Sequence, residues 1–257
     1  MAVNILAVGD VTGQAGIDIL SEKLRGVIKW GNVAFTVVNG ENAAGLGITP
    51  NQAEALFDAG ADVITLGNHT WGAQKINRFL DESKYILRPS NFAPQVPGRG
   101  WGVYDTAFGG VSVINLVGRV HMPYGTENPF FEADKILKQL ETKIVLVDFH
   151  AEATSEKYGM AYYLDGRISA LWGTHTHVQT SDQRVFPGGT GFITDLGMTG
   201  ACDSIIGMKP GEPVSRFLGN PPGRFEPADG PAKIEGAIFE IDQDTGNCVG
   251  VEAIRIT

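Results

Sequence analysis

The 257-residue sequence predicts one α/β domain, residues 1–257, built as a sandwich of two β-sheets with helices on its outer faces. Across the first two-thirds, short β-rich runs alternate with segments of helical periodicity, as in successive βαβ units. The last third instead carries β patterns separated by glycine and proline. Hydrophobic residues make up 43% of the chain, enough for a sizeable core, and α/β domains often reach this length undivided.

The first third is expected to alternate three strands with three helices. The strands are short apolar runs at Val3–Val8, Val33–Val38 and Asp62–Leu66. The first helix, Gln14–Trp30, carries apolar residues at helical spacing. The second begins at Thr49-Pro50, an N-cap followed by proline at the first helical position, and Gly60 ends it. The third lies near Ala73–Leu80.

The hydrophobic period changes in the middle of the chain. Val103–Ala107 and Val111–Leu116 resemble the strands of a hairpin joined by a Gly109-Gly110 turn. Two helices and two apolar strands should follow, in the order Phe131–Leu140, Ile144–Phe149, Glu152–Tyr162 and Ile168–Trp172. The remaining predicted elements are strands at Gly191–Thr194, Ala232–Ile241 and Val249–Ile256, with a proline-containing surface loop at Asn220–Gly230.

Composition excludes several classes of protein. Twenty Lys and Arg against 29 Asp and Glu give a net charge of −9, which disfavours binding of long nucleic acids. A small phosphate ligand remains compatible, because two divalent ions add about +4 of local charge. The sequence contains neither a membrane-length apolar run nor a signal peptide, and Cys202 and Cys248 lie in no metal-binding spacing. We therefore expect a cytoplasmic protein with no membrane partner.

Polar signatures follow five of the predicted strands. They are Gly9-Asp10, Asn39-Gly40-Glu41-Asn42, Gly67-Asn68-His69, Asp148-Phe149-His150 and Gly173-Thr174-His175-Thr176-His177. Ligands of α/β sheets bind beyond the carboxyl ends of the strands, so these groups are expected to meet at one edge.

Histidine is concentrated in these signatures, which hold four of the five histidines in the chain. One histidine at a strand end is usually structural, but four beside Asp10, Glu41 and Asn68 favour a metal site. His175 and His177 are two residues apart, so on extended backbone they would point the same way. The absence of thiolates suits iron or manganese, with zinc or magnesium as alternatives. Six or seven ligands fit two bridged ions, which would supply hydroxide at neutral pH and clamp phosphoryl oxygens.

These motifs resemble those of the calcineurin-like metallophosphoesterases. Four segments resemble more narrowly the YmdB-type branch: the Gly9–Gly13 run, the Asn39–Asn42 run, the segment from Asp148 to Glu156 and the Thr-His-Thr-His run. The similarity covers essentially the whole chain. The resemblance implies a four-layer α/β/β/α metallophosphoesterase sandwich. It also implies a dinuclear metal-dependent phosphoesterase that uses metal-bound hydroxide.

The resemblance also assigns a role to each residue. Asp10 and His177 would bind the first metal with Asn42 as an extra ligand, and Glu41 would bridge the two ions. The second metal would be completed by Asn68, His150 and His175. The remaining histidine of the signatures, His69, would protonate the leaving oxygen, which suits an imidazole.

Two positions depart from the wider superfamily. Thr12 stands where many members have a histidine, and Glu41 stands where they use aspartate; both features agree with the YmdB-type branch. That branch implies a phosphodiesterase acting on cyclic nucleotides such as 2′,3′-cyclic AMP, and it suggests a homo-oligomer. A phosphomonoesterase, or a metal-binding regulatory or scaffold protein with incidental turnover, is the alternative.

Several nearby polar residues have two interpretations from sequence alone. Glu152 and Glu156 either orient a ligand or begin a solvated helix. Ser204 lacks a nucleophile elbow and is expected to be structural. His121 is expected in a loop or at the pocket rim, and Arg119 either contacts phosphate or forms a surface ion pair.

Overall fold

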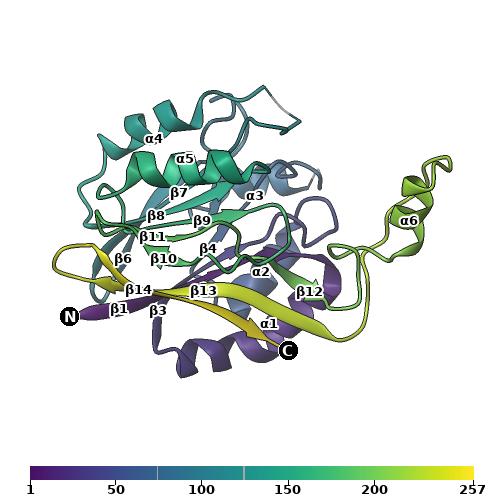
Figure 1. Cartoon of the computed structure of the whole chain (residues 1–257), viewed down its shortest axis with the longest axis horizontal. Coiled ribbons are helices and arrows are strands. Elements are labelled where there is room, and N and C mark those ends of the chain that lie inside the picture. Colours follow the sequence, from purple (N-terminus) through teal and green to yellow (C-terminus); the bar gives the residue numbers. More distant parts are fainter. Residues whose placement is uncertain (74, 124) are drawn as a thin grey trace.

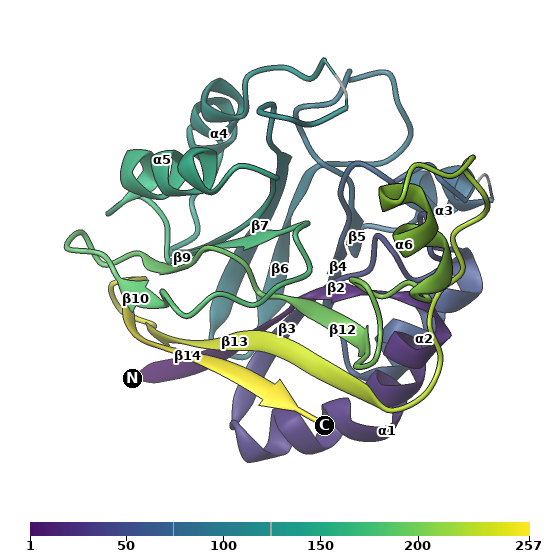
Figure 2. The ribbon, with the colours of Figure 1, turned by 45° about the vertical axis from the view of Figure 1, so that its right-hand side comes forward.

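The computed structural model, which describes residues 1–73, 75–123 and 125–257, contains two mixed β-sheets packed face to face between layers of helices (Figure 1). Figure 2 shows α4 and α5 on one side of the sheets and α1 and α2 on the other. The helices are α1 (Gly13–Trp30), α2 (Pro50–Ala59), α3 (Ile76–Glu82), α4 (Pro129–Leu137), α5 (Thr154–Leu164) and α6 (Gly211–Phe217). The predicted four-layer α/β/β/α sandwich is confirmed.

The first sheet has the strand order β2-β12-β13-β1-β3-β4-β5, with β14 paired to β13. Its strands are β1 (Ala2–Val8), β2 (Asp10–Val11), β3 (Val33–Asn39), β4 (Val63–Thr65), β5 (Ile86–Leu87), β12 (Met198–Ala201), β13 (Ala232–Asp242) and β14 (Cys248–Ile256). Strands β1, β3, β4 and β5 run parallel, whereas β13 pairs antiparallel with β1 and β14. The carboxyl ends of the parallel strands therefore share one edge.

The second sheet has the strand order β10-β11-β9-β8-β7-β6. Its strands are β6 (Trp101–Thr106), β7 (Gly109–Val117), β8 (Ile144–His150), β9 (Ala170–Thr174), β10 (Arg184–Val185) and β11 (Gly191–Ile193). The central strands β7, β8, β9 and β11 are parallel, and antiparallel β6 and β10 lie at the edges.

Three apolar clusters hold the layers together. Alternating residues of β1 divide between two of them: Leu6 and Val8 pack against α1 and α2, whereas Ile5 and Ala7 face the second sheet. The third cluster packs α4 and α5 against the far face of the second sheet. Central strands such as β8 and β9 are thus buried on both faces, which explains why they appear as continuous apolar runs.

Helix α2 shows how closely local sequence sets an element. Thr49 and Gln52 form a reciprocal capping box, Pro50 begins the helix, and Gly60 ends it with a φ of 125°. Both predicted boundaries are confirmed, because these local signals act without help from tertiary contacts.

Other expectations were wrong in detail. The hairpin turn is Ala107-Phe108, and Gly109 already pairs with Thr106 as the first residue of β7. The short elements β2, β5, β10, β12 and α6 were not anticipated, because two to seven residues carry too little periodicity. The predicted helix near 73–80 corresponds to α3, and its position 74 lies outside the described residues. Within the described ranges, no helix is long and apolar enough to cross a membrane.

Candidate metal centre

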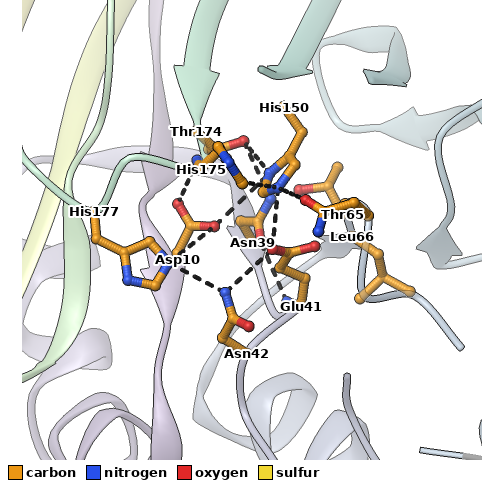
Figure 3. A network of polar contacts seen from close by, with 12 residues as sticks. Asp10, Asn39, Glu41, Asn42, Thr65, Leu66, His150, Thr174, His175 and His177 are labelled. Carbon is orange, nitrogen blue, oxygen red and sulfur yellow. Dashed lines mark hydrogen bonds and ion pairs between the residues drawn. The ribbon is translucent and has the colours of Figure 1, made fainter. Parts of the chain in front are cut away.

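The five predicted signatures meet at one site, to which both sheets contribute. Figure 3 labels residues from four of them, with Gly67-Asn68-His69 the exception. Strands β1, β3 and β4 bring their signatures from the first sheet, and β8 and β9 bring theirs from the second. The carboxylates Asp10 and Glu41 and the imidazole of His150 are fully buried there. The parallel strand direction within each sheet explains this convergence, as expected for the carboxyl edge of α/β sheets.

His150 lies at the centre of one group of facing atoms. Its Nε2 is 3.0 Å from Glu41 Oε1, 3.0 Å from Asn68 Oδ1 and 3.1 Å from His175 Nδ1. Ligating atoms of Glu41, His150 and His175 all lie within 4.8 Å of one another. This spacing is what a single ion needs to contact all three side chains.

Asp10 and His177 form a looser second group. Asp10 Oδ1 lies 3.9 Å from His177 Nε2, and Asp10 Oδ2 accepts a hydrogen bond from the His175 backbone N–H at 3.1 Å. Burial raises the pKa of Asp10 to about 6, although His177 and His150 act in the opposite direction. The buried Oδ1 has no hydrogen-bond partner among the described residues.

The side chains of the site differ in their protonation. Burial would raise the pKa of Glu41, but His150 and His69 hold it well below its usual range. Burial, together with His150, lowers the pKa of His175 to about 3. Glu41 is therefore ionised and His175 neutral at pH 7, the forms in which carboxylate and imidazole bind metals.

A buried network determines which nitrogen of His150 faces the site. Thr174 Oγ1 donates to Asp148 Oδ1 at 2.8 Å and accepts from His150 Nδ1 at 2.9 Å. Asp148 also accepts from Thr65 Oγ1 at 2.5 Å and from Asn39 Nδ2 at 3.1 Å. With Nδ1 bonded to Thr174, His150 turns Nε2 toward the site, as is usual for metal-binding histidines with an outer partner. Burial lowers the pKa of His150, but Glu41 and Asp10 raise it to about 9, so a cation bound at Nε2 would take the place of a proton.

The backbone at His175 and His177 is not extended, so the prediction that they lie on extended backbone was wrong. Strand β9 ends at Thr174, so His175 and His177 do not lie on extended backbone; their φ angles are 100° and 62°. This left-handed conformation is rare for residues with side chains and needs support from the surroundings. Thr176 supplies it, since its N–H and Oγ1 both donate to the buried Asp195 Oδ2, at 3.2 and 2.8 Å.

His177 has a further anchor. Its Nδ1 donates to the carbonyl of Ile206 at 2.8 Å, leaving Nε2 to face Asp10. Ile206 is itself a β-branched residue at a φ of 45°. The segment after β12 thus orients a histidine from β9, a contact that spacing in the sequence does not reveal.

His69 and Asn42 sit together at the edge of the cluster. The backbone N–H of His69 donates to Glu41 Oε2, and His69 Nδ1 is 3.1 Å from Asn42 Oδ1. The Asn42 amide nitrogen lies 3.1 Å from both Glu41 Oε1 and His177 Nε2. In this orientation Asn42 links His69 to the cluster and turns its oxygen away from Asp10.

The contacts of the remaining candidate residues distinguish their roles. Glu152 Oε2 lies 3.1 Å from His175 Nε2, which fits a role in orienting that ring. Glu156 instead accepts the backbone N–H groups of Arg119 and Val120. Within the described residues, Ser204 bonds the backbone of its own loop, at Ala201 and Gly207, as expected for a structural residue. The exposed His121 lies outside the cleft beside the cluster.

The sequence alone did not predict that Asp148, Thr174 and Asp195 support the residues of the cluster. Asp148 and Thr174 stand inside signatures that were noticed, whereas Asp195 follows β11 in the run Thr194-Asp195-Leu196-Gly197. An acidic residue followed by glycine at a strand end was the available signal. Its role depends on packing against Lys157 of α5, 38 residues earlier in the chain.

The donor set fits divalent cations. Carboxylate, amide and imidazole groups are buried together, and Asp10 Oδ1 lacks a protein donor among the described residues. An unpaired buried carboxylate oxygen is costly, and a cation offsets that cost. The arrangement can hold two ions, one beside His150 and His175 and one beside Asp10 and His177.

A cleft of about 540 Å³ opens beside the cluster. Its polar lining includes Glu41, Asn42, His69, His175 and His177, and its apolar lining includes Leu46, Ile206, Phe217 and Phe225. Its volume lies in the range of small-molecule sites.

Solved structures share this fold. The crystal structure of a phosphatase from Mycoplasma pneumoniae has a TM-score of 0.94 at 33% identity, over 100% of this chain and 94% of that one. A crystal structure of a hypothetical protein from Thermus thermophilus has a TM-score of 0.93 at 34% identity, over 99% of both chains. The fold and its strand-end cluster are those of a metallophosphoesterase.

Sequence comparison narrows the class to one family. The chain belongs to the YmdB-like protein family, whose sequence model matches residues 6–254. A 2′,3′-cyclic-nucleotide 2′-phosphodiesterase of Bacillus subtilis (strain 168) is 42% identical over 257 residues, 99% of this chain and 97% of that protein. The resemblance inferred from the motifs is confirmed.

Proposed function

We propose that this protein is a metal-dependent phosphodiesterase that hydrolyses cyclic nucleotides of the 2′,3′-cyclic AMP type. The observation that carries the proposal is the buried cluster in which Glu41, His150 and His175 present their ligating atoms to one another beside the unpartnered oxygen of Asp10. The relative from Bacillus subtilis, named for this activity, supports the substrate class.

The proposed metal ligands divide between two ions. Asp10 and His177 would hold the first ion with Asn42, whose amide must turn over to present its oxygen. Glu41 would bridge to the second ion, which Asn68, His150 and His175 would complete. Iron or manganese suits this oxygen and nitrogen set, with zinc or magnesium as alternatives. When bound, such a pair lowers the pKa of a coordinated water and offsets charge on the phosphoryl oxygens.

His69 is the proposed proton donor to the leaving oxygen. Its Nδ1 lies 3.1 Å from Asn42 Oδ1, and the turned-over Asn42 amide would place its NH2 group there instead, so in either orientation Nε2 is the ring atom that remains for substrate. The side chain lines the cleft and is about one-third exposed, which allows it to meet the ester. Imidazole suits proton transfer near neutral pH.

The charge of the cleft favours a diester over a monoester. Among the described residues that line it, none is Lys or Arg, and Glu152 adds a carboxylate beside His175. A monoester carries about two negative charges at pH 7, and a diester carries one. The protein surface therefore gives a dianion less compensation, which makes a phosphomonoesterase the weaker candidate.

The proposal is tested with bis-p-nitrophenyl phosphate and p-nitrophenyl phosphate on metal-stripped protein resupplied with Mn²⁺. We expect metal-dependent hydrolysis that favours the diester and is lost in His150→Ala. His121→Ala is the matched control, because that histidine is exposed and outside the cleft. Bound metal without turnover of either ester would favour the regulatory or scaffold alternative.

A further inference from the structure

A group of apolar side chains, here called the apolar wall, lines the same cleft as the metal cluster. We define it by five side chains that line the cleft: Leu46, Ile206, Met208, Phe217 and Phe225. Leu46 comes from the loop after β3, and the others come from residues 206–225, which carry α6. Helix α6 stands away from both sheets at the end of the molecule (Figure 1).

The side chains of the apolar wall are exposed to an extent that is unusual for large apolar residues. Phe217 is 85% exposed, Leu46 59%, Ile206 52% and Phe225 40%. A single exposed apolar residue needs no explanation, but several lining one cleft mark a binding surface. These side chains are therefore available to a ligand held at the neighbouring cluster.

The wall segment is held by contacts within itself and by one contact to the cluster. Ile205 and Met208 exchange backbone hydrogen bonds at 2.9 and 3.0 Å, and the Arg216 guanidinium lies 4.3 Å from the centroid of the Phe225 ring. The carbonyl of Ile206 accepts the hydrogen bond from His177 Nδ1, so the wall and the cluster are joined directly. The strained φ of Ile206 is consistent with a functional constraint at this position.

We propose that the apolar wall binds the nucleobase of the substrate while its phosphodiester lies at the metal cluster. This inference rests on the proposed function, because it assigns a subsite for that substrate. Base faces stack on aromatic and apolar side chains whatever the base, and the wall side chains carry no amide, hydroxyl or charge to distinguish base edges. The subsite therefore selects nucleotides over simple alkyl diesters and tolerates all four bases.

The kinetic test uses two substrates that differ only in the base: adenosine 2′,3′-cyclic phosphate and methyl riboside 2,3-cyclic phosphate. We expect the wild-type protein to prefer the nucleotide in kcat/KM by about 5- to 150-fold, the range for one stacked base. Phe225→Ala and Leu46→Ala, which change two wall residues from different segments of the chain, should each reduce this preference. Phe131→Ala, an exposed phenylalanine on α4, should retain it.

A binding measurement separates this inference from the proposed function. Saturation-transfer NMR of adenosine 2′,3′-cyclic phosphate with metal-free protein should show the strongest saturation at the adenine protons, reduced in Phe225→Ala. Adenine saturation without turnover by the metal-loaded protein would support the wall and refute the phosphodiesterase. Turnover with equal kcat/KM for both diesters would refute the wall alone.

A second copy of the chain is the competing occupant of the wall. If Phe225→Ala dissociated an oligomer in sedimentation velocity and left both the substrate preference and the adenine saturation unchanged, the wall would be an interface between copies. The base-binding proposal would then be wrong.

Discussion

Replacing Lys157 by methionine should destabilise the protein strongly. Lys157 Nζ lies 2.7 Å from Asp195 Oδ2, and both side chains are 1% exposed. Methionine retains most of the aliphatic stem but removes the only cation that this carboxylate contacts among the described residues. Breaking one partner of a buried pair costs about 3–5 kcal/mol, since the remaining charge stays in a poorly solvating interior.

The structure also predicts how that cost can be relieved. Replacing Asp195 by asparagine removes the unpaired charge, and the amide oxygen could still accept from the Gly197 N–H at Oδ1, although the oxygen that accepts from Thr176 would become an amide nitrogen. Lys157→Met/Asp195→Asn should therefore be more stable than Lys157→Met alone, with a coupling of about 1–3 kcal/mol. The same two variants also change the support of the metal centre, because Asp195 holds Thr176, which lies between His175 and His177.

Urea unfolding measures both effects. With a slope of about 1–3 kcal/mol/M, the midpoint for Lys157→Met should fall by about 1 M or more. Lys135→Met is the matched control: its partner Glu132 is 3.2 Å away, but Lys135 is 70% exposed, so the change should cost no more than about 1 kcal/mol. Equal midpoint shifts for the two single variants would refute the reasoning.

Three further outcomes are expected. Gly26→Ala should raise the free energy of unfolding by about 0.5–1 kcal/mol in the same urea assay. Gly26 is exposed within α1, and an added Cβ would meet nothing within 4 Å. A loss of stability would show that the helix needs glycine there. Burial would raise the pKa of Asp182, but hydrogen bonds from Thr180, Thr194 and Tyr158 hold it below its ordinary 3.8. Its stabilising contribution is therefore present above about pH 4 and is lost as pH falls through the folded pKa, so urea midpoints of Asp182→Asn should approach those of wild type on acidification. A constant difference across pH would contradict this sign. Burial raises the pKa of the Cys248 thiol to about 11, whereas Cys202 is exposed, so a disulfide reagent should titrate one thiol in the folded protein and two after unfolding; two rapid thiols would contradict the burial.

The sequence by itself determined the main elements and the composition of the site. Continuous apolar runs predicted the central strands because both faces of each sheet are covered. Thr49, Pro50 and Gly60 placed α2 through purely local capping. The polar signatures named the residues that the fold brings together, because the carboxyl ends of parallel strands share an edge.

Only the tertiary structure decided how those residues are presented. The left-handed backbone at His175 and His177 depends on Asp195, and the orientation of His150 Nε2 toward the site depends on Thr174 and Asp148. These contacts join residues far apart in the chain, so no local periodicity encodes them. The apolar wall also depends on tertiary structure. Residues 206–225 contain little regular structure and are rich in glycine and proline, so they show no periodic pattern. Their place beside the cluster arises from packing, which joins a late loop to a strand end of the other sheet.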